Sequence, residues 1–211
     1  DTVTTQLAIC GPGKTVLSGA KTFNGLTYIT GGEVEIDDPD ALGSGNYTWN
    51  SGYIQLSNDA ILSFSESMDP VANATNGRKE FTVKISATGG AIKVRDADDT
   101  VTFSANGIQV REGGRFRKLG PGKLVQTKSG HAVNSTGEGN FKWPWARVEY
   151  LEGTCATDSN FPQDSGVLDV DNGVTVVGSR WISPNQAGAG GGGNRLETQG
   201  KRQLRIGPGG V

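Results

Sequence analysis

Residues 111–122 read REGGRFRKLGPG, and residues 198–209 read TQGKRQLRIGPG. The two stretches align without a gap at an offset of 87 residues (198 − 111), and each runs from a basic segment through an aliphatic residue into Gly-Pro-Gly. Self-similarity of this kind matters because a repeated supersecondary unit sets the whole architecture. The match predicts that the chain carries one β unit twice.

Two further matches support the duplication. Residues 45–49 read GNYTW and residues 139–143 read GNFKW, and a third Gly-Pro-Gly at residues 11–13 precedes the first copy. We therefore predict a first β repeat over residues 14–122 and a second over residues 123–209. Both form one compact body, with residues 1–13 and 203–211 as terminal arms. The structural repeat positions are Trp49, Trp143, Gly120, Pro121 and Gly122.

Short runs of alternating apolar and polar residues recur along the chain, which is the signature of half-buried strands. They occupy residues 27–30, 33–36, 53–56, 81–86, 91–95, 101–103, 108–111, 148–151 and 174–177. Asn-Gly and Gly-Gly dipeptides lie between several runs and favour tight hairpin turns. The predicted fold class is all-β with few or no helices: a tandem duplicated β unit with pseudo-twofold symmetry, built of antiparallel hairpins in a sandwich-like or double-sheet body.

Composition argues against two classes of partner. The chain has 20 basic and 22 acidic side chains, so its net charge of −2 provides no basic surface for nucleic acid. No apolar run approaches the roughly 20 residues that a membrane-spanning helix needs. We expect neither nucleic acid binding nor membrane insertion.

Several motifs resemble ligand sites without completing them. Residues 11–15 read GPGKT, but a phosphate-binding loop needs a further Gly where this chain has Ala8. Residues 169–173 read DVDNG, which places the glycine of a calcium loop one position early. His131 is the sole histidine, which is too few for an ordinary zinc site. We predict no enzyme activity and no catalytic, cofactor-binding or metal-binding residue, although 22 carboxylates leave a glycosidase open.

The tryptophans leave an alternative open. Trp145 and Trp181, together with the two repeat tryptophans, could form a sugar-stacking platform, as in a secreted carbohydrate-binding module. Aromatic residues in strands more often pack in the core. Cys10 and Cys155 could form one disulfide, but a single pair far apart in sequence does not decide the question.

The duplicated unit with its GN-aromatic-x-Trp turn, basic strand and aliphatic-GPG tail resembles the pyrenoid shell proteins of diatoms. This resemblance covers residues 9–211. It implies a structural protein of the chloroplast stroma that self-assembles into a sheet at the pyrenoid periphery, encloses Rubisco and supports CO2 concentration. Its partners would be further copies and paralogous shell proteins, and its two cysteines would be free thiols.

The C-terminal tail is the leading candidate for the assembly interface, because a glycine-rich terminal strand can add to a neighbour by backbone pairing. The candidate residues are Gln203, Leu204, Arg205, Ile206, Gly207, Pro208, Gly209, Gly210 and Val211. The main rival is a phage or viral capsid decoration or fibre protein, found in a virion. The other rival, the carbohydrate-binding module, would be extracellular.

Overall fold

The described residues form strands and turns. The computed structural model describes residues 6–21, 23, 25–43, 53–70, 82–103, 108–110, 114–126, 133–135, 147–161, 167–170, 175–181 and 203–206. Within these ranges there is no helix, and therefore none long and apolar enough to cross a membrane. The all-β prediction is confirmed for this part of the chain.

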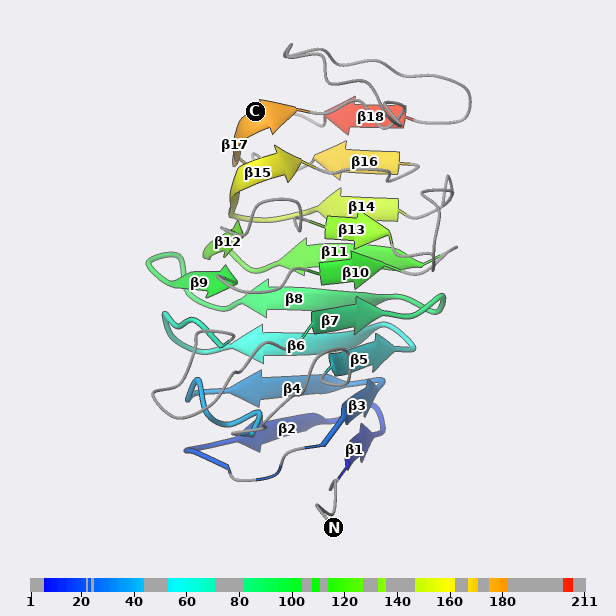
Figure 1. Ribbon diagram of the computed structural model, residues 1–211, viewed down its shortest axis with the longest axis vertical. Helices are drawn as coiled ribbons and strands as arrows, with labels where there is room; N and C mark the ends of the chain where they lie inside the picture. The colour runs from blue at the N-terminus through cyan, green and yellow to red at the C-terminus, as the bar shows by residue number, and fades with distance from the viewer. Residues whose placement is uncertain are drawn as a thin grey trace.

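The strands form three parallel sheets, which Figure 1 shows as rungs stacked from the N-terminal end to the C-terminal end. Sheet A contains β1 (Leu7–Cys10), β3 (Thr27–Thr30), β5 (Tyr53–Ser57), β7 (Thr82–Ile85), β10 (Ile108–Val110) and β13 (Val133–Ser135). Sheet B contains β2 (Lys14–Leu17), β4 (Glu33–Ile36), β6 (Ala60–Phe64), β8 (Gly90–Val94), β11 (Arg115–Leu119), β14 (Arg147–Tyr150), β16 (Val167–Val170) and β18 (Gln203–Ile206). Sheet C contains β9 (Thr100–Phe103), β12 (Lys123–Gln126), β15 (Thr154–Phe161) and β17 (Thr175–Trp181).

The chain winds from one sheet to the next and then begins again one level higher. We call each such passage a coil: β1 and β2 form the first coil, and β7, β8 and β9 form the fourth. Strands of successive coils run in the same direction, so each pairs in parallel with its counterpart in the next coil. This winding defines a parallel β-helix, a solenoid in which each level contacts mainly its neighbours.

The interior of the solenoid is a stack of apolar side chains. Val34, Leu62 and Ile92 stand in register on β4, β6 and β8, and all three are buried. The same inward alternation recurs in sheet A, where Ile54 and Leu56 of β5 are buried and the residues beside them are half-buried. Because side chains alternate across a strand, every second position faces this core and the others face outward.

The corner between sheets A and B repeats from coil to coil. Gly32 connects β3 to β4 with φ of +68°, and a Cβ atom built there would lie 2.3 Å from the carbonyl oxygen of Gly13 in the coil before. A side chain therefore fits neither the left-handed backbone nor the space between the corners. The close approach lets Gly13 accept a hydrogen bond from the N–H of Glu33 at 3.0 Å.

The prediction of antiparallel hairpins is wrong, because every pairing between described strands is parallel. The sandwich-like body is not confirmed either. The dipeptide Gly31-Gly32, which resembles a hairpin turn, connects two strands that belong to different sheets. A tight turn sets the direction of the chain locally, whereas β4 pairs with β2 before it and with β6, whose Ile61 lies opposite Glu33 and 28 residues after it.

The tandem duplication is not confirmed. The alignment of residues 111–122 with residues 198–209 sets Arg117 opposite Leu204, but the strand register passes from Phe116 through Val148 and Leu168 to Leu204. A slip of one residue exchanges the two faces of a strand. The alternating runs that follow the matched stretches 45–49 and 139–143, residues 53–56 and 147–150, also lie in different sheets, A and B. The boundary between residues 122 and 123 stays a prediction.

The two cysteines lie far apart along the solenoid. Cys10 ends β1 in the first coil and is an exposed free thiol, while Cys155 lies in β15 of the sixth coil. Five strand spacings of about 4.8 Å separate these coils by about 24 Å, whereas a disulfide needs Cα atoms within about 7 Å of each other. A bridge between them within one chain is excluded.

Candidate functional site

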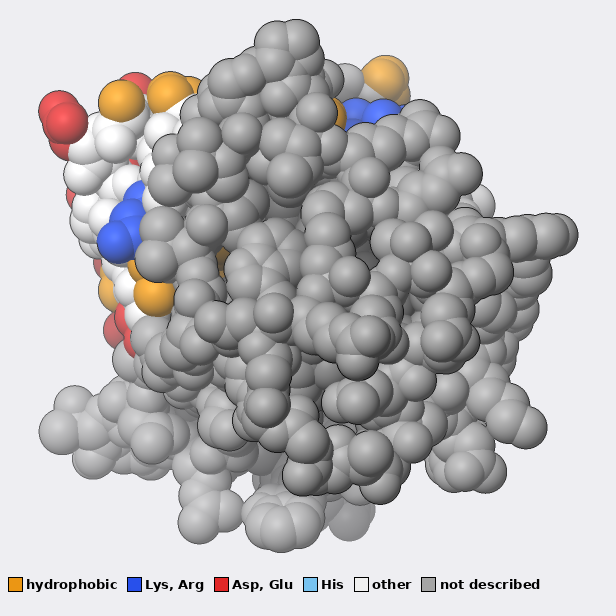
Figure 2. Space-filling model, turned by 90° about the horizontal axis from the view of Figure 1, so that it is seen from above, with side chains coloured by type: hydrophobic (Ala, Val, Ile, Leu, Met, Phe, Trp, Pro, Cys, Tyr) orange, Lys and Arg blue, Asp and Glu red, His pale blue; other side chains and the backbone are white. Residues whose placement is uncertain are grey.

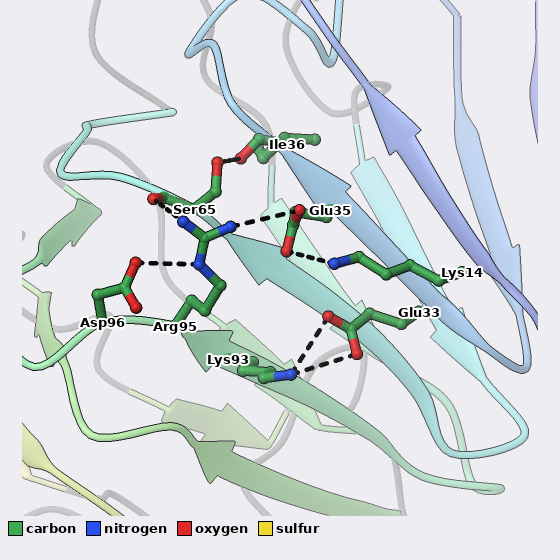
Figure 3. A network of polar contacts seen from close by, with 8 residues as sticks. All are labelled: Lys14, Glu33, Glu35, Ile36, Ser65, Lys93, Arg95 and Asp96. Carbon is green, nitrogen blue, oxygen red and sulfur yellow. Dashed lines mark hydrogen bonds and ion pairs between the residues drawn. The ribbon is translucent and has the colours of Figure 1, made fainter.

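The outer face of sheet B carries a network of ion pairs between coils, which Figure 3 shows from close by. Glu35 of β4 lies at its centre with its side chain only 8% exposed. One carboxylate oxygen lies 2.8 Å from Nζ of Lys14 on β2, and the other lies 3.6 Å from Nη1 of Arg95, which follows β8. The neighbouring Glu33 reaches Nζ of Lys93 at 3.3 Å.

The pairs with Lys93 and Arg95 cross over β6, which lies between β4 and β8. β6 presents the small Ser63 in register with Glu35 on one side and Lys93 on the other. Asp96 accepts a hydrogen bond from Nε of Arg95 at 2.9 Å and thereby raises the pKa of that guanidinium above its usual value. Ion pairs with a solvent-exposed partner contribute little to stability, so the network connects coils without dominating their stability.

Two further pairs continue this pattern on β11. Nε of Arg115 lies 2.6 Å from Oε2 of Glu149 in the next coil, and Nη2 of Arg117 lies 3.0 Å from Oδ1 of Asp59 in an earlier one. Figure 2 shows described acidic and basic side chains close together at one side of the molecule. The charges of this face are thus largely compensated within the chain.

A buried lysine fixes the corner between sheets B and C. Lys118 points inward from β11 and has no exposed surface. Its ammonium donates to the carbonyl oxygens of Gly120, of Gly122 at 2.6 Å and of Glu152 at 2.9 Å. The N–H of Gly120 in turn donates to Oε2 of Glu152 at 2.7 Å. These contacts connect the turn after β11 to the turn before β15, one coil further on.

The outer face of sheet A differs in chemistry. Tyr28 of β3 and Tyr53 of β5 meet edge to face, with ring centroids 6.0 Å apart and hydroxyl oxygens 3.1 Å apart. The ammonium of Lys84 on β7 lies 4.0 Å from the centroid of the Tyr53 ring, a cation–π contact. Beside them, the hydroxyls of Thr30 and Ser57 lie 3.2 Å apart. This face offers hydroxyl groups and aromatic rings instead of ion pairs.

We expect Tyr28 to ionise at a higher pH than an ordinary tyrosine. The hydrogen bond with Tyr53, then burial, raises the pKa of Tyr28. Because the folded-state pKa lies above the unfolded value of about 10, the stabilisation is complete below pH 10 and disappears as the pH rises through the raised pKa. A titration of tyrosine Cζ signals by NMR measures this. Tyr53→Phe should move the pKa of Tyr28 back toward 10, Tyr150→Phe in β14 should leave it unchanged, and an ordinary pKa in the unaltered protein would contradict the pairing.

The predicted repeat and interface residues fall at several places. Gly120, Pro121 and Gly122 form the corner between β11 and β12. Residues 203–206 form β18, which pairs in parallel with β16, while residues 207–211 lie outside the described residues. Trp49, Trp143, Trp145 and His131 also lie outside them. The backbone of Trp181 ends β17 opposite Phe161 of β15.

Two features of these sites were not predicted from the sequence. Lys118 occupies an inward position of an alternating strand, where an apolar residue is expected. The signal in the sequence is this basic residue at an apolar position, two residues before Gly-Pro-Gly. Tyr28 and Tyr53 occupy the outward positions of two alternating runs. Their proximity could not be read without knowing that β3 and β5 pair.

Comparison with known proteins adds no relative, since no family model, no curated protein and no solved structure matches this chain. Among the described residues there is no group of three or more His, Cys, Asp or Glu side chains that could hold a metal ion. The class that the described residues define is therefore architectural: a parallel β-helix with one outer face of paired charges and one outer face that carries tyrosines, hydroxyl groups and a lysine.

Proposed function

We propose that this chain is a structural segment of a fibre, of the phage or viral kind, in which copies join end to end along the solenoid axis. The observation that supports this proposal most strongly is the construction of sheet B. Its eight strands stack in parallel and in register along one axis, and the two outermost, β2 and β18, each pair with a single strand among the described residues. A stack of this kind is extended by the addition of a further parallel strand at either edge.

The backbone of β2 supports such an addition. Gly13 accepts from the N–H of Glu33, so the backbone groups of residues 13, 15 and 17 are directed at β4. In a strand, successive N–H and C=O groups point to opposite sides, which turns those of Lys14 and Val16 away from β4. Val16 is also 52% exposed, a high value for a large apolar side chain.

The test is negative-stain electron microscopy of the purified chain at raised concentration. We expect filaments one solenoid wide, because strands that add at one edge in one direction give an open, non-closing assembly. Val16→Pro should abolish them, since proline has no N–H to offer an incoming strand and at this position removes no bond to β4.

The matched control is Val16→Thr, which keeps a β-branched side chain and the backbone N–H and should still form filaments. Circular dichroism and thermal unfolding establish that the proline variant keeps its β structure. Particles that stay monomeric at high concentration, or filaments that persist in the proline variant, contradict end-to-end pairing through β2.

The pyrenoid shell function remains a prediction with less support. It depends on two equivalent halves and on a free terminal arm. The runs at residues 53–56 and 147–150 lie in different sheets, the register of β11 and β18 is shifted by one residue from the alignment, and residues 203–206 already pair with β16 on one side. Two-dimensional sheets in the same micrographs would favour the shell, with its chloroplast location and paralogous partners, over the fibre and its place in a virion. The fibre proposal does not depend on the duplication, and the expectation of no enzyme activity stays a prediction.

A further inference from the structure

The outer face of sheet A carries a small patch of side chains whose polar groups are not all paired with other described residues. We define the sheet A patch as Tyr28, Tyr53, Gln55 and Lys84. Tyr28 on β3 stands in register with Gln55 on β5, which in turn stands in register with Lys84 on β7. Tyr53 lies two residues before Gln55 on the same face of β5, because side chains alternate along a strand. All four side chains are half-buried.

The contacts of the patch leave two groups available. Within the described part of the chain, the amide of Gln55 makes no hydrogen bond, and the ammonium of Lys84 contacts the Tyr53 ring but no carboxylate. On sheet B, by contrast, each of the five lysine and arginine side chains in the pairs described above has a carboxylate partner. Among the described residues, the patch thus combines a cation that has no carboxylate partner with an amide that makes no hydrogen bond.

The charge of the patch narrows the class of ligand. The outward residues described on β1, β3, β5 and β7 include Lys84 and no aspartate or glutamate. One cation among hydroxyl and amide groups matches a ligand with an occasional carboxylate and many hydroxyls. A nucleic acid, with a phosphate on every residue, needs a row of lysines and arginines instead.

The geometry also fits an extended chain. Neighbouring strands lie about 4.8 Å apart, which is close to the length of one pyranose residue in an extended glycan. A glycan lying along the solenoid axis would therefore meet β3, β5 and β7 with successive sugars. Its ring C–H groups would contact the two tyrosines, and its hydroxyls would reach Gln55 and the hydroxyl pair of Thr30 and Ser57.

We propose that the sheet A patch binds an acidic glycan, with Lys84 pairing with a uronate or sialate carboxylate and Gln55 bonding to its hydroxyls. This binding function goes beyond the fibre proposal, and either can hold without the other. In a fibre, the patch would recur along the axis once per chain. Such repetition turns weak single contacts into strong attachment to a polymeric glycan.

The experiment is NMR titration of the full chain with hexamers of galacturonate, hexamers of mannuronate and α2,8-linked trimers of N-acetylneuraminate, with neutral maltohexaose for comparison. We expect at least one acidic glycan to shift the signals of β3, β5 and β7 and to bind more weakly as salt rises. Lys84→Gln should weaken that binding about tenfold, the effect of losing one charged hydrogen bond. Gln55→Glu should abolish it by placing a like charge at the centre of the patch.

The matched control is Lys123→Gln, which removes the same charge from an exposed lysine at the start of β12 in sheet C and should leave the affinity unchanged. Thermal unfolding shows whether each variant keeps its fold. The proposal is overturned if none of the three acidic glycans binds, if maltohexaose binds equally well, or if Gln55→Glu binds as the unaltered chain does. It is also overturned if sedimentation shows that Gln55→Glu dissociates a dimer, because the patch would then be a contact between copies.

Discussion

Replacement of Lys118 by methionine lowers the free energy of unfolding by about 3–5 kcal/mol, because several buried carbonyl oxygens lose their donor and each unsatisfied group costs about 1–3 kcal/mol. Methionine matches the length and apolar stem of lysine, so the loss comes from the ammonium. Without it, the carbonyl oxygens of Gly120, Gly122 and Glu152 lose a buried donor. Water cannot readily replace it, since Lys118 has no exposed surface. Urea unfolding followed by circular dichroism measures the change.

The control for this variant is Lys93→Met. Lys93 also belongs to sheet B and pairs with a carboxylate, but 32% of its side chain is exposed, so its replacement should cost about 1 kcal/mol or less. Hydrogen exchange then locates the effect. The stability of a solenoid level depends mainly on its neighbours. Lys118→Met should therefore speed amide hydrogen exchange in β11, β12 and β15 more than in β3 and β4. Equal losses for the two variants would mean that the buried ammonium contributes no more than a surface pair.

Strand positions could be read from the sequence because they depend on local alternation. Each of the nine alternating runs falls on a strand, as residues 27–30 do on β3 and residues 33–36 on β4. Alternation shows that a strand has one buried face and one outer face, but it does not identify the neighbouring strand. Parallel strands are usually buried on both faces and read as continuous apolar runs. Here the outer faces carry Glu33, Glu35 and Lys93, and the pattern therefore imitates an antiparallel sheet.

The coils themselves escaped detection because they differ in length. Successive register positions in sheet B are Lys14, Glu33, Ile61 and Ala91, which gives steps of 19, 28 and 30 residues. A repeat search depends on a fixed period, and none exists here. The Gly-Pro-Gly turns did mark corners, but Gly11–Gly13 lies between sheets A and B and Gly120–Gly122 between sheets B and C. Similar local turn chemistry thus suggested a duplication that the strand register does not confirm.

The candidate sites could not be predicted from the sequence for a related reason, because each joins residues that only the register between coils brings together. Lys118 reaches Glu152, 34 residues away, and the Tyr28 hydroxyl meets that of Tyr53, 25 residues away. Nothing in the local sequence specifies these partners. The inward position of Lys118 was nevertheless visible in its strand as a basic residue at an apolar position, and such local conflicts tend to mark positions with a special role.

Replacement of Phe64 by alanine is expected to cost about 3–5 kcal/mol, the usual effect of removing a buried aromatic ring from a core. Phe64 ends β6, is fully buried, and meets Phe103 of β9 edge to face at a centroid distance of 6.1 Å. β9 is the first strand of sheet C, and it also contacts the preceding coil through the isolated bridge between Met68 and Val101 and through the N–H of Thr100, which donates to the Ser67 hydroxyl at 2.9 Å. Loss of the ring therefore leaves a cavity where the third sheet begins.

A double-mutant cycle separates the ring contact from the cavity. Phe64→Leu keeps most of the volume and should cost less than about 1.5 kcal/mol, and Phe103→Ala combined with Phe64→Ala should show a coupling of about 0.5–1.5 kcal/mol. Urea unfolding measures the four proteins of the cycle and Phe64→Leu, and hydrogen exchange should show the largest loss of protection in β6, β8 and β9. Strict additivity of the two alanine variants would mean that the rings contribute only their separate burial. In that case sheet C would begin at β9 because of the Met68 bridge and not because of the aromatic pair.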